Sequence, residues 1–407
     1  MNNPSKTPWT SVRGRVPLAA LTVALASGCA ARVEHSTDEG QATRRTEALT
    51  LVGPADDAWG AAFVDTTPTA HGSASNGGTP VVTMVATGWY HVDFPGIEGS
   101  GGNVQLSTMS PYAHCTTLAW YPESVPITSA NPIGVVLRTT IACVDLTSAP
   151  TNASYYVLYQ RHSHAMPAGS AAVMAWDDLS TTSGPTNRTY AWNSSGGSVT
   201  STRTAAGTYS LLLGAGVGGY GVGTPNGGMA FVTAYGTTAA WCSVTQLSTV
   251  GANISAGVAC YDHTGAVVDS QFTFLFVQNS APILGLSGGY ALMNTATGPG
   301  FFPPPAGNAH FYSTGSSGLK YSLQLSNGYA DFIGLTPPTS SPLTVDPGRV
   351  LVLAGAYGTT TNYCLGSAMV ATAAPAGTTI EGFCLAPTGS KVTTVGSMSA
   401  GLAIVSP

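Results

Sequence analysis

The chain has 407 residues, of which 8% are charged and 50 are glycine, and its net charge at pH 7 is −5. Globular proteins are roughly 25% charged, so solubility here must rest on hydroxyl and amide groups. This balance excludes a basic nucleic-acid-binding protein, and the composition excludes coiled coil and collagen. Scarce Leu, Lys and Glu beside plentiful Thr, Ser, Gly and Val predict strands joined by tight turns.

The N-terminal segment has the pattern of an export signal. A basic stretch precedes an apolar run over residues 16–26, which is too short to span a bilayer. Small residues then lead into Cys29 in the sequence ASGC, which resembles a bacterial lipobox. We therefore predict a signal peptide over residues 1–28, a lipid on the Cys29 thiol and a polar tether over residues 29–50.

The residue after Cys29 indicates where the chain would be delivered. It is Ala30, not the Asp that would retain a lipoprotein at the inner membrane. The lipobox resemblance therefore implies an outer-membrane or cell-surface protein held to the membrane by its lipid. The alternative is an ordinary secretory signal and a fully secreted chain.

One pattern recurs three times in the rest of the chain. Residues 234–242 (AYGTTAAWC) and 356–364 (AYGTTTNYC) nearly match, and residues 107–115 (STMSPYAHC) are a weaker copy. Upstream of each lies a glycine-rich turn and then a Gly followed within three residues by Tyr. A period this long indicates domain-sized repeats. The predicted repeats are residues 51–165, 166–280 and 281–407.

Alternation of apolar and polar residues predicts about six strands in each repeat. In the second copy they are expected at residues 171–176, 198–213, 228–236, 239–247, 254–262 and 269–277. This favours an all-β chain of three tandem antiparallel β-sandwich-like repeats. The alternative is a β-propeller or another closed pseudo-threefold assembly, which would need eight strands in each copy.

Six cysteines remain once Cys29 is set aside, an even number that in an exported chain predicts disulfides. No CxxC or CxxH spacing is present, so zinc is not expected. Each copy holds two of the cysteines near the turns of different strands. The predicted pairs are therefore Cys115–Cys143, Cys242–Cys260 and Cys364–Cys384.

These features together resemble a group of secreted bacterial proteins with tandem repeats of the form NSxGG, GxY, a Cys pair and a final-strand Phe. The second copy matches best, at Asn193, Gly196, Gly197, Gly207, Tyr209, Cys242, Cys260 and Phe272. The group has no established activity. The resemblance therefore implies a β fold and export, and no chemistry.

Two short motifs suggest catalysis or cofactor binding and are better explained as loops. Gly214, Gly216 and Gly219 match GxGxxG, but the sequence that follows cannot begin the helix that a dinucleotide requires. Ser287 lies in GxSxG, but a nucleophile elbow needs a helix after it, and a strand is predicted there. We therefore expect no cofactor and assign no catalytic residue.

A pair of histidines lies close to two acids at the junction of the first two repeats. On an extended segment His162 and His164 would share a face, and Asp177 or Asp178 could complete a metal site. The other junctions have no such group. An exposed linker explains these residues better, so no metal site is predicted.

Acidic residues recur at equivalent positions but not in every copy. Asp145 and Asp262 correspond to Ala386 in the third copy, which favours Asx turns over chemistry. A second set of equivalent positions holds side chains that each carry an acceptor oxygen, which predicts a structural hydrogen bond there: Asp65, Asp177 and Asn294.

Aromatic rings are the remaining candidates for a binding site. Most are expected in the core, and one or more are candidates for stacking on a sugar: Trp89, Trp120, Trp176, Trp192 and Trp241.

Because the scaffold recurs while the polar residues differ, the sequence favours a non-enzymatic, lipid-anchored surface protein that binds a glycan or a protein, or displays its repeats. The alternative is a secreted hydrolase of an extracellular polymer with one active repeat.

Overall fold

The computed structural model describes residues 57–99, 101–110, 112–126, 134–162, 170–178, 184–187, 191–214 and 228–278, and eight strands between residues 287 and 406. All of them belong to one compact unit, residues 44–407. The expected signal peptide, Cys29 and the tether lie outside the described residues.

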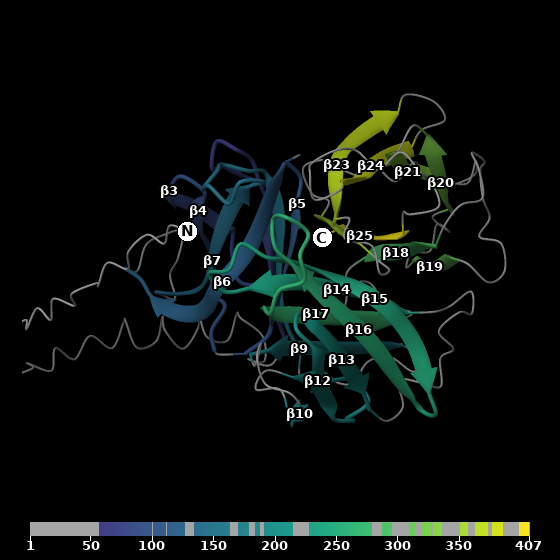
Figure 1. Ribbon diagram of the computed structural model, residues 1–407. Helices are drawn as coiled ribbons and strands as arrows, with labels where there is room; N and C mark the ends of the chain where they lie inside the picture. The colour runs from purple at the N-terminus through teal and green to yellow at the C-terminus, as the bar shows by residue number, and fades with distance from the viewer. Residues whose placement is uncertain are drawn as a thin grey trace, which may run out of the picture. The chain divides into compact units, whose positions relative to one another are not determined.

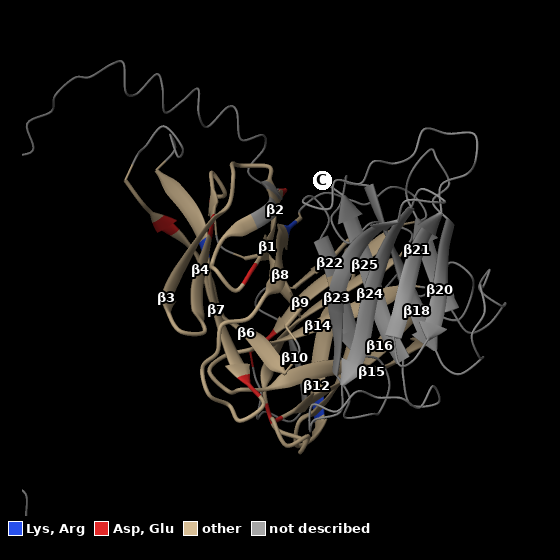
Figure 2. Cartoon of the chain, turned by 90° about the horizontal axis from the view of Figure 1, so that it is seen from above, with Lys and Arg blue, Asp and Glu red and all other residues tan. Residues whose placement is uncertain are grey.

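The described residues confirm an all-β chain. They form strands β1 to β25 and contain no α-helix (Figure 1). In this part of the chain no helix has the length and apolar character needed to cross a membrane. Acidic and basic residues are few and scattered over the strands (Figure 2), in keeping with the low charge of the sequence.

The first repeat region forms two sets of four strands. One sheet has the order β2-β1-β8-β5, and the other set has the order β3-β4-β7-β6. The strands are β1 Ala58–Val64, β2 Ala70–Ser75, β3 Val81–Ala86, β4 Trp89–Pro95, β5 Asn103–Thr108, β6 Ala113–Ser124, β7 Val135–Asp145 and β8 Tyr155–Arg161.

The second region has the same strand orders, β11-β9-β17-β14 and β12-β13-β16-β15, with β10 added beside β12. The bounds are β9 Ala171–Asp177, β10 Gly184–Asn187, β11 Trp192–Asn193, β12 Val199–Ala205, β13 Thr208–Leu213, β14 Met229–Tyr235, β15 Trp241–Val250, β16 Asn253–Tyr261 and β17 Gln271–Gln278. The expectation of about six strands was too low, since residues 198–213 form a hairpin and the short β10 and β11 carry no alternation signal.

The third region has the orders β19-β18-β25-β22 and β20-β21-β24-β23, so all three regions share one pair of strand orders. Each of the five sheets formed by the described strands is open. The bounds are β18 Ser287–Asn294, β19 Ala309–Ser313, β20 Lys320–Ser326, β21 Tyr329–Leu335, β22 Leu351–Ala356, β23 Tyr363–Thr372, β24 Gly377–Leu385 and β25 Ser399–Ser406.

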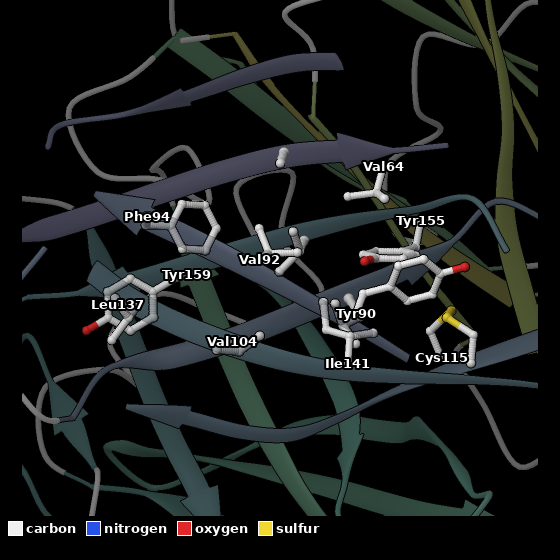
Figure 3. Packing of buried hydrophobic residues seen from close by; sticks show 14 of the residues in the cluster. Val64, Tyr90, Val92, Phe94, Val104, Cys115, Leu137, Ile141, Tyr155 and Tyr159 are labelled. Carbon is white, nitrogen blue, oxygen red and sulfur yellow. A yellow bond between two sulfur atoms is a disulfide. The ribbon is translucent and has the colours of Figure 1, made fainter. Parts of the chain in front are cut away.

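Each of the first two regions has its own apolar cluster, and each cluster takes side chains from both of its strand sets. In the first region Tyr90 and Phe94 of β4 face Tyr155 and Tyr159 of β8 (Figure 3). The Tyr90 and Tyr155 ring centroids are 5.3 Å apart in an edge-to-face arrangement. Fully burying a side chain of this size contributes roughly 1.5–3 kcal/mol. The alternation along β4 is therefore what directs these rings inward.

The Gly-x-Tyr motif marks a corner that the first two regions share. Gly88 and Gly207 have φ values of 70° and 61°, and a Cβ on Gly207 would lie 2.6 Å from the Val268 carbonyl oxygen. The tyrosine two residues later accepts a hydrogen bond at its hydroxyl from the segment just before the last strand of the region. The Ala153 N–H donates to Tyr90 at 3.3 Å, and the Ser270 N–H donates to Tyr209 at 3.1 Å. Glycine is required because a side chain would meet backbone there.

The first two regions are joined by β6 and β14, which pair in parallel at Thr117 and Tyr235. The Gly236 N–H donates to the Thr117 carbonyl at 2.9 Å. This contact joins β11-β9-β17-β14 to β6-β7-β4-β3 in one eight-stranded sheet.

A second contact between the two regions covers β5, the edge strand of its sheet. The Leu106 N–H donates to Thr233 Oγ1 at 2.9 Å, and the Thr273 hydroxyl donates to the Val104 carbonyl at 2.5 Å. Asn103 Nδ2 also donates to two carbonyls of the second region, at 3.1 Å each. Threonine hydroxyls thus form hydrogen bonds with backbone groups of β5 that would otherwise pair with a neighbouring strand.

Candidate functional site

The recurring aspartates form Asx turns, as predicted. Asp145 Oδ1 accepts the Thr147 N–H at 2.8 Å and hydroxyl at 2.6 Å, and Asp262 Oδ1 accepts the same two groups of Thr264 at 2.9 and 2.6 Å. These bonds favour the ionised form, so the side-chain hydrogen bond from each threonine lowers the pKa of its Asp partner. Asp65 makes the same contacts to Thr67.

Asp177 is a buried structural acceptor. It is the last residue of β9, is 2% exposed and receives the Ser201 hydroxyl. The structural hydrogen bond predicted for this position is therefore present.

His162 does not lie in an exposed linker, which corrects that expectation. The residue follows β8 and is 7% exposed. Its Nε2 lies 3.0 Å from Gln160 Oε1, and its Nδ1 lies 3.7 Å from Asp57 Oδ1. The ring of Trp192 packs beside it at 5.5 Å between centroids. Burial by these neighbours, which the sequence pattern did not signal, explains the difference.

The rest of the suspected metal cluster is only partly described. His164 falls outside the described residues, and the Asp178 carbonyl accepts Gln271 Nε2 at 2.8 Å. Among the residues whose placement is given, no group of three or more His, Cys, Asp or Glu could hold a metal ion.

Neither of the two short motifs is followed by a helix in the described part of the chain. Ser287 is the first residue of β18, so the described element after it is a strand and not the helix of a nucleophile elbow. Gly214 closes the described part of its segment, with its N–H donating to the Ser198 carbonyl at 2.8 Å. Gly216 and Gly219 lie outside the described residues.

Two of the predicted cysteine pairs are disulfides, Cys115–Cys143 and Cys242–Cys260. Both join residues directly opposite each other on paired strands, β6 with β7 and β15 with β16. In the third region Cys364 and Cys384 are also directly opposite, on β23 and β24.

Of the five candidate tryptophans, four pack against other rings. Trp241 is 7% exposed and stacks on Tyr261 at 4.5 Å between centroids. Trp120 and Trp176 contact each other at 5.5 Å, and Trp192 packs beside His162. Trp89 differs, because it is 44% exposed.

Trp89 lies on a surface that we name the outer face. It is the side of strands β3, β4, β7 and β6 that points away from the first apolar cluster. Residues directly opposite each other on neighbouring strands form rows across this face. In one row Arg138 has Asp93 on one side and Tyr121 on the other. The next rows pair His91 with Thr140 and Trp89 with Ala142. Tyr121 is 42% exposed. Trp89 and Tyr121 are separated by about 13 Å along the strand direction and by about 10 Å across the strands.

An ion-pair cluster occupies the middle of the outer face. Arg138 donates from Nε to Asp93 Oδ1 at 2.8 Å and from a terminal nitrogen to Oδ2 at 2.7 Å, and it also contacts Glu123. The side-chain hydrogen bond to Asp93 raises the pKa of Arg138. The guanidinium is therefore charged and fixed by its acids next to Tyr121, two rows along the face from Trp89, and the acids are still partly exposed.

The corresponding face of the second region is different in character. The cross-strand neighbours there are Ser210 with Gly257, and Leu212 with Ser255. Serines, a glycine and Leu212 stand there in place of the rings and charges. The outer face of the first region is therefore not a property of the shared scaffold.

Sequence reasoning considered Trp89 but missed its neighbours on this face. The available signal was the alternation in β4, where Trp89, His91 and Asp93 interleave with the buried Tyr90, Val92 and Phe94. The positions of Arg138 and Tyr121 opposite them depended on strand register, which the sequence did not provide.

Comparisons of this chain with family models, with curated proteins and with solved structures find no match.

Proposed function

We propose that the chain is built from three tandem two-sheet β-sandwiches at residues 51–165, 166–280 and 281–407. The strand orders shared by the three regions support this. So does the packing of the first two, since each apolar cluster lies between strands of both sets. The first and third regions do have the eight described strands that a propeller would need, but strands of the first two regions join in one eight-stranded sheet, which separate four-stranded blades would not form.

The same proposal places the protein at the cell surface, held by a lipid on Cys29. The disulfides support an oxidising compartment. The apolar run before Cys29 supports export. The surface is the outer membrane or the cell exterior.

Its function is to bind an extracellular glycan without chemical turnover. The observation that carries this is the outer face, where the fixed Arg138 guanidinium lies beside exposed Tyr121 and exposed Trp89 lies two rows further along. Exposed aromatic faces give a sugar ring apolar contact, and a preorganised guanidinium and carboxylates give hydrogen bonds to hydroxyls. The acids that recur between repeats, Asp145 and Asp262, accept hydrogen bonds within Asx turns. This structural role favours binding over hydrolysis.

Binding is tested with a glycan array and the purified full-length chain. Trp89→Ala should lower affinity for the bound glycan by about tenfold or more, which corresponds to about 1.4 kcal/mol. Thr208→Ala is the matched control on the equivalent strand of the second region and should bind as the wild type does. Glycan binding that is equal in all three proteins, or no glycan binding at all, would refute the proposal.

Anchoring is tested by detergent phase separation of cells that express the full chain. The wild type should partition with the membrane, and Cys29→Ser should be released. A Cys29→Ser chain that stays in the membrane fraction would rule out the lipid anchor.

A further inference from the structure

Strand β3 ends the eight-stranded sheet with one edge open. It pairs with β4 on one side, and no other described strand pairs with it on the other. Every residue of β3 except Val82 is exposed, including Val81 at 50%, Met84 at 42% and Val85 at 52%. The strand is uncharged and contains no proline (Figure 2). Lysine, proline and an inward charge, which often prevent edge pairing, are missing from β3, and its one irregularity is a register shift between Met84 and Ala86 near the end of the strand.

The second region indicates what such an edge accommodates. Strand β12 has the position of β3 in the shared strand order, and its outer side is covered by β10. The pairing is antiparallel and runs from Gly184 opposite Arg203 to Asn187 opposite Thr200. An extended segment therefore fits this edge of the scaffold. In the first region no described strand takes the place of β10.

We propose that β3 pairs antiparallel with β3 of a second copy of this chain, giving a two-fold dimer with one continuous sheet. An antiparallel pair of identical strands satisfies the free backbone groups of both copies through one two-fold axis. Because β3 carries no charge, its own copy approaches without like-charge repulsion. Val81 lies on the same face as Asp93 and Met84 on the same face as Tyr90, so each would be covered by residues of the partner strand on its own face of the new pair. An edge for a charged foreign strand would carry complementary charge, and β3 carries none.

The dimer is tested by sedimentation equilibrium of the full-length chain in neutral detergent. We expect a dimer in the wild type and at least about a tenfold rise in the dissociation constant for Met84→Lys, since two ammonium groups would meet near the axis. Leu212→Lys is the matched control, because Leu212 is also exposed, at 38%, but lies on β13, which has a neighbour on each side. It should leave the dimer unchanged.

Hydrogen exchange gives an independent measure of backbone pairing. Amides of residues 81–86 should exchange more slowly at concentrations that favour the dimer, and equally fast at all concentrations in Met84→Lys. A chain that is monomeric throughout, a dimer unaffected by Met84→Lys, or protection of β3 only after another protein is added would overturn the proposal. Met84 points to the side opposite the outer face, so glycan binding by Met84→Lys reports on the proposed function separately.

Discussion

At the scale of single residues, burial decides what the few titratable groups do. His114 on β6 is 5% exposed, and its ring stacks on Trp241 of the second region at 6.1 Å between centroids. Burial lowers the pKa of His114 to about 4. The imidazole is therefore neutral in the folded chain at physiological pH, and it serves as a packing group where the two regions meet.

This burial predicts an acid-sensitive contribution to stability. The unfolded chain binds a proton at His114 near pH 6.5 and the folded chain only near pH 4. The contribution is complete above about pH 6.5 and is lost as pH falls towards 4, by about 3 kcal/mol in total. Denaturant unfolding of the wild type and of His114→Phe from pH 7 to pH 4 should show a smaller loss in the variant. Parallel pH profiles would contradict this account.

At the scale of elements, the Gly-x-Tyr corner of the second region connects the start of β13 with the segment that leads into β17, the last strand of that region. The Cys260 N–H donates to the Gly207 carbonyl at 2.9 Å, and the Gly207 N–H donates to Asp269 Oδ1 at 2.6 Å. Asp269 in turn holds Arg203 by two bonds of 2.8 Å. The corner therefore fixes three strands with the backbone of one glycine.

Two glycines with the same backbone angle separate strain from steric contact. Gly207 and Gly251 both have φ of 61°, but a Cβ meets nothing within 4 Å at Gly251 and lies 2.6 Å from the Val268 carbonyl oxygen at Gly207. Gly251→Ala should cost about 1–2 kcal/mol for the left-handed backbone alone. Gly207→Ala should cost a further 1–3 kcal/mol or so, because backbone must move. Thermal unfolding of both variants measures the difference, and equal losses would show that the corner is not tightly packed.

At the scale of the whole molecule, hydroxyl groups of one region complete the hydrogen bonds of another. Thr233 Oγ1 accepts the Leu106 N–H and donates to Gln105 Oε1 at 3.1 Å, and Gln105 is 1% exposed. In a chain with few charges, threonine on an outward sheet face can satisfy a neighbouring edge strand. This contact explains why β5 keeps polar residues at buried positions.

Removing one hydroxyl should therefore weaken the contact between the first two regions. Thr233→Val leaves the Leu106 N–H without its acceptor and should lower the free energy of unfolding by about 1–3 kcal/mol. Thr249→Val, at an exposed position of β15, is the control and should change it by less than about 0.5 kcal/mol. Chemical denaturation of both variants provides the measurement. A Thr233→Val chain as stable as the control would show that water replaces the bond.

The strand positions in the second region were largely predictable, because alternation along a strand depends only on neighbours in sequence. The sequence also predicted the Cys115–Cys143 and Cys242–Cys260 disulfides and the turns at Asp145 and Asp262. The hairpin within residues 198–213 was read as one run, since its turn at Gly207 is short.

Local pattern alone thus determined the β character and the turn chemistry of this chain, and the recurring pattern predicted the Cys115–Cys143 and Cys242–Cys260 pairs. Only the tertiary structure decided that His162 is buried, that Arg138 lies between Asp93 and Tyr121, and that β12 has a covering strand while β3 shows none among the described strands. The reason is physical: the period of a strand and the geometry of a turn are set within a few residues. Burial, register and edge pairing are set by strands far apart in the sequence.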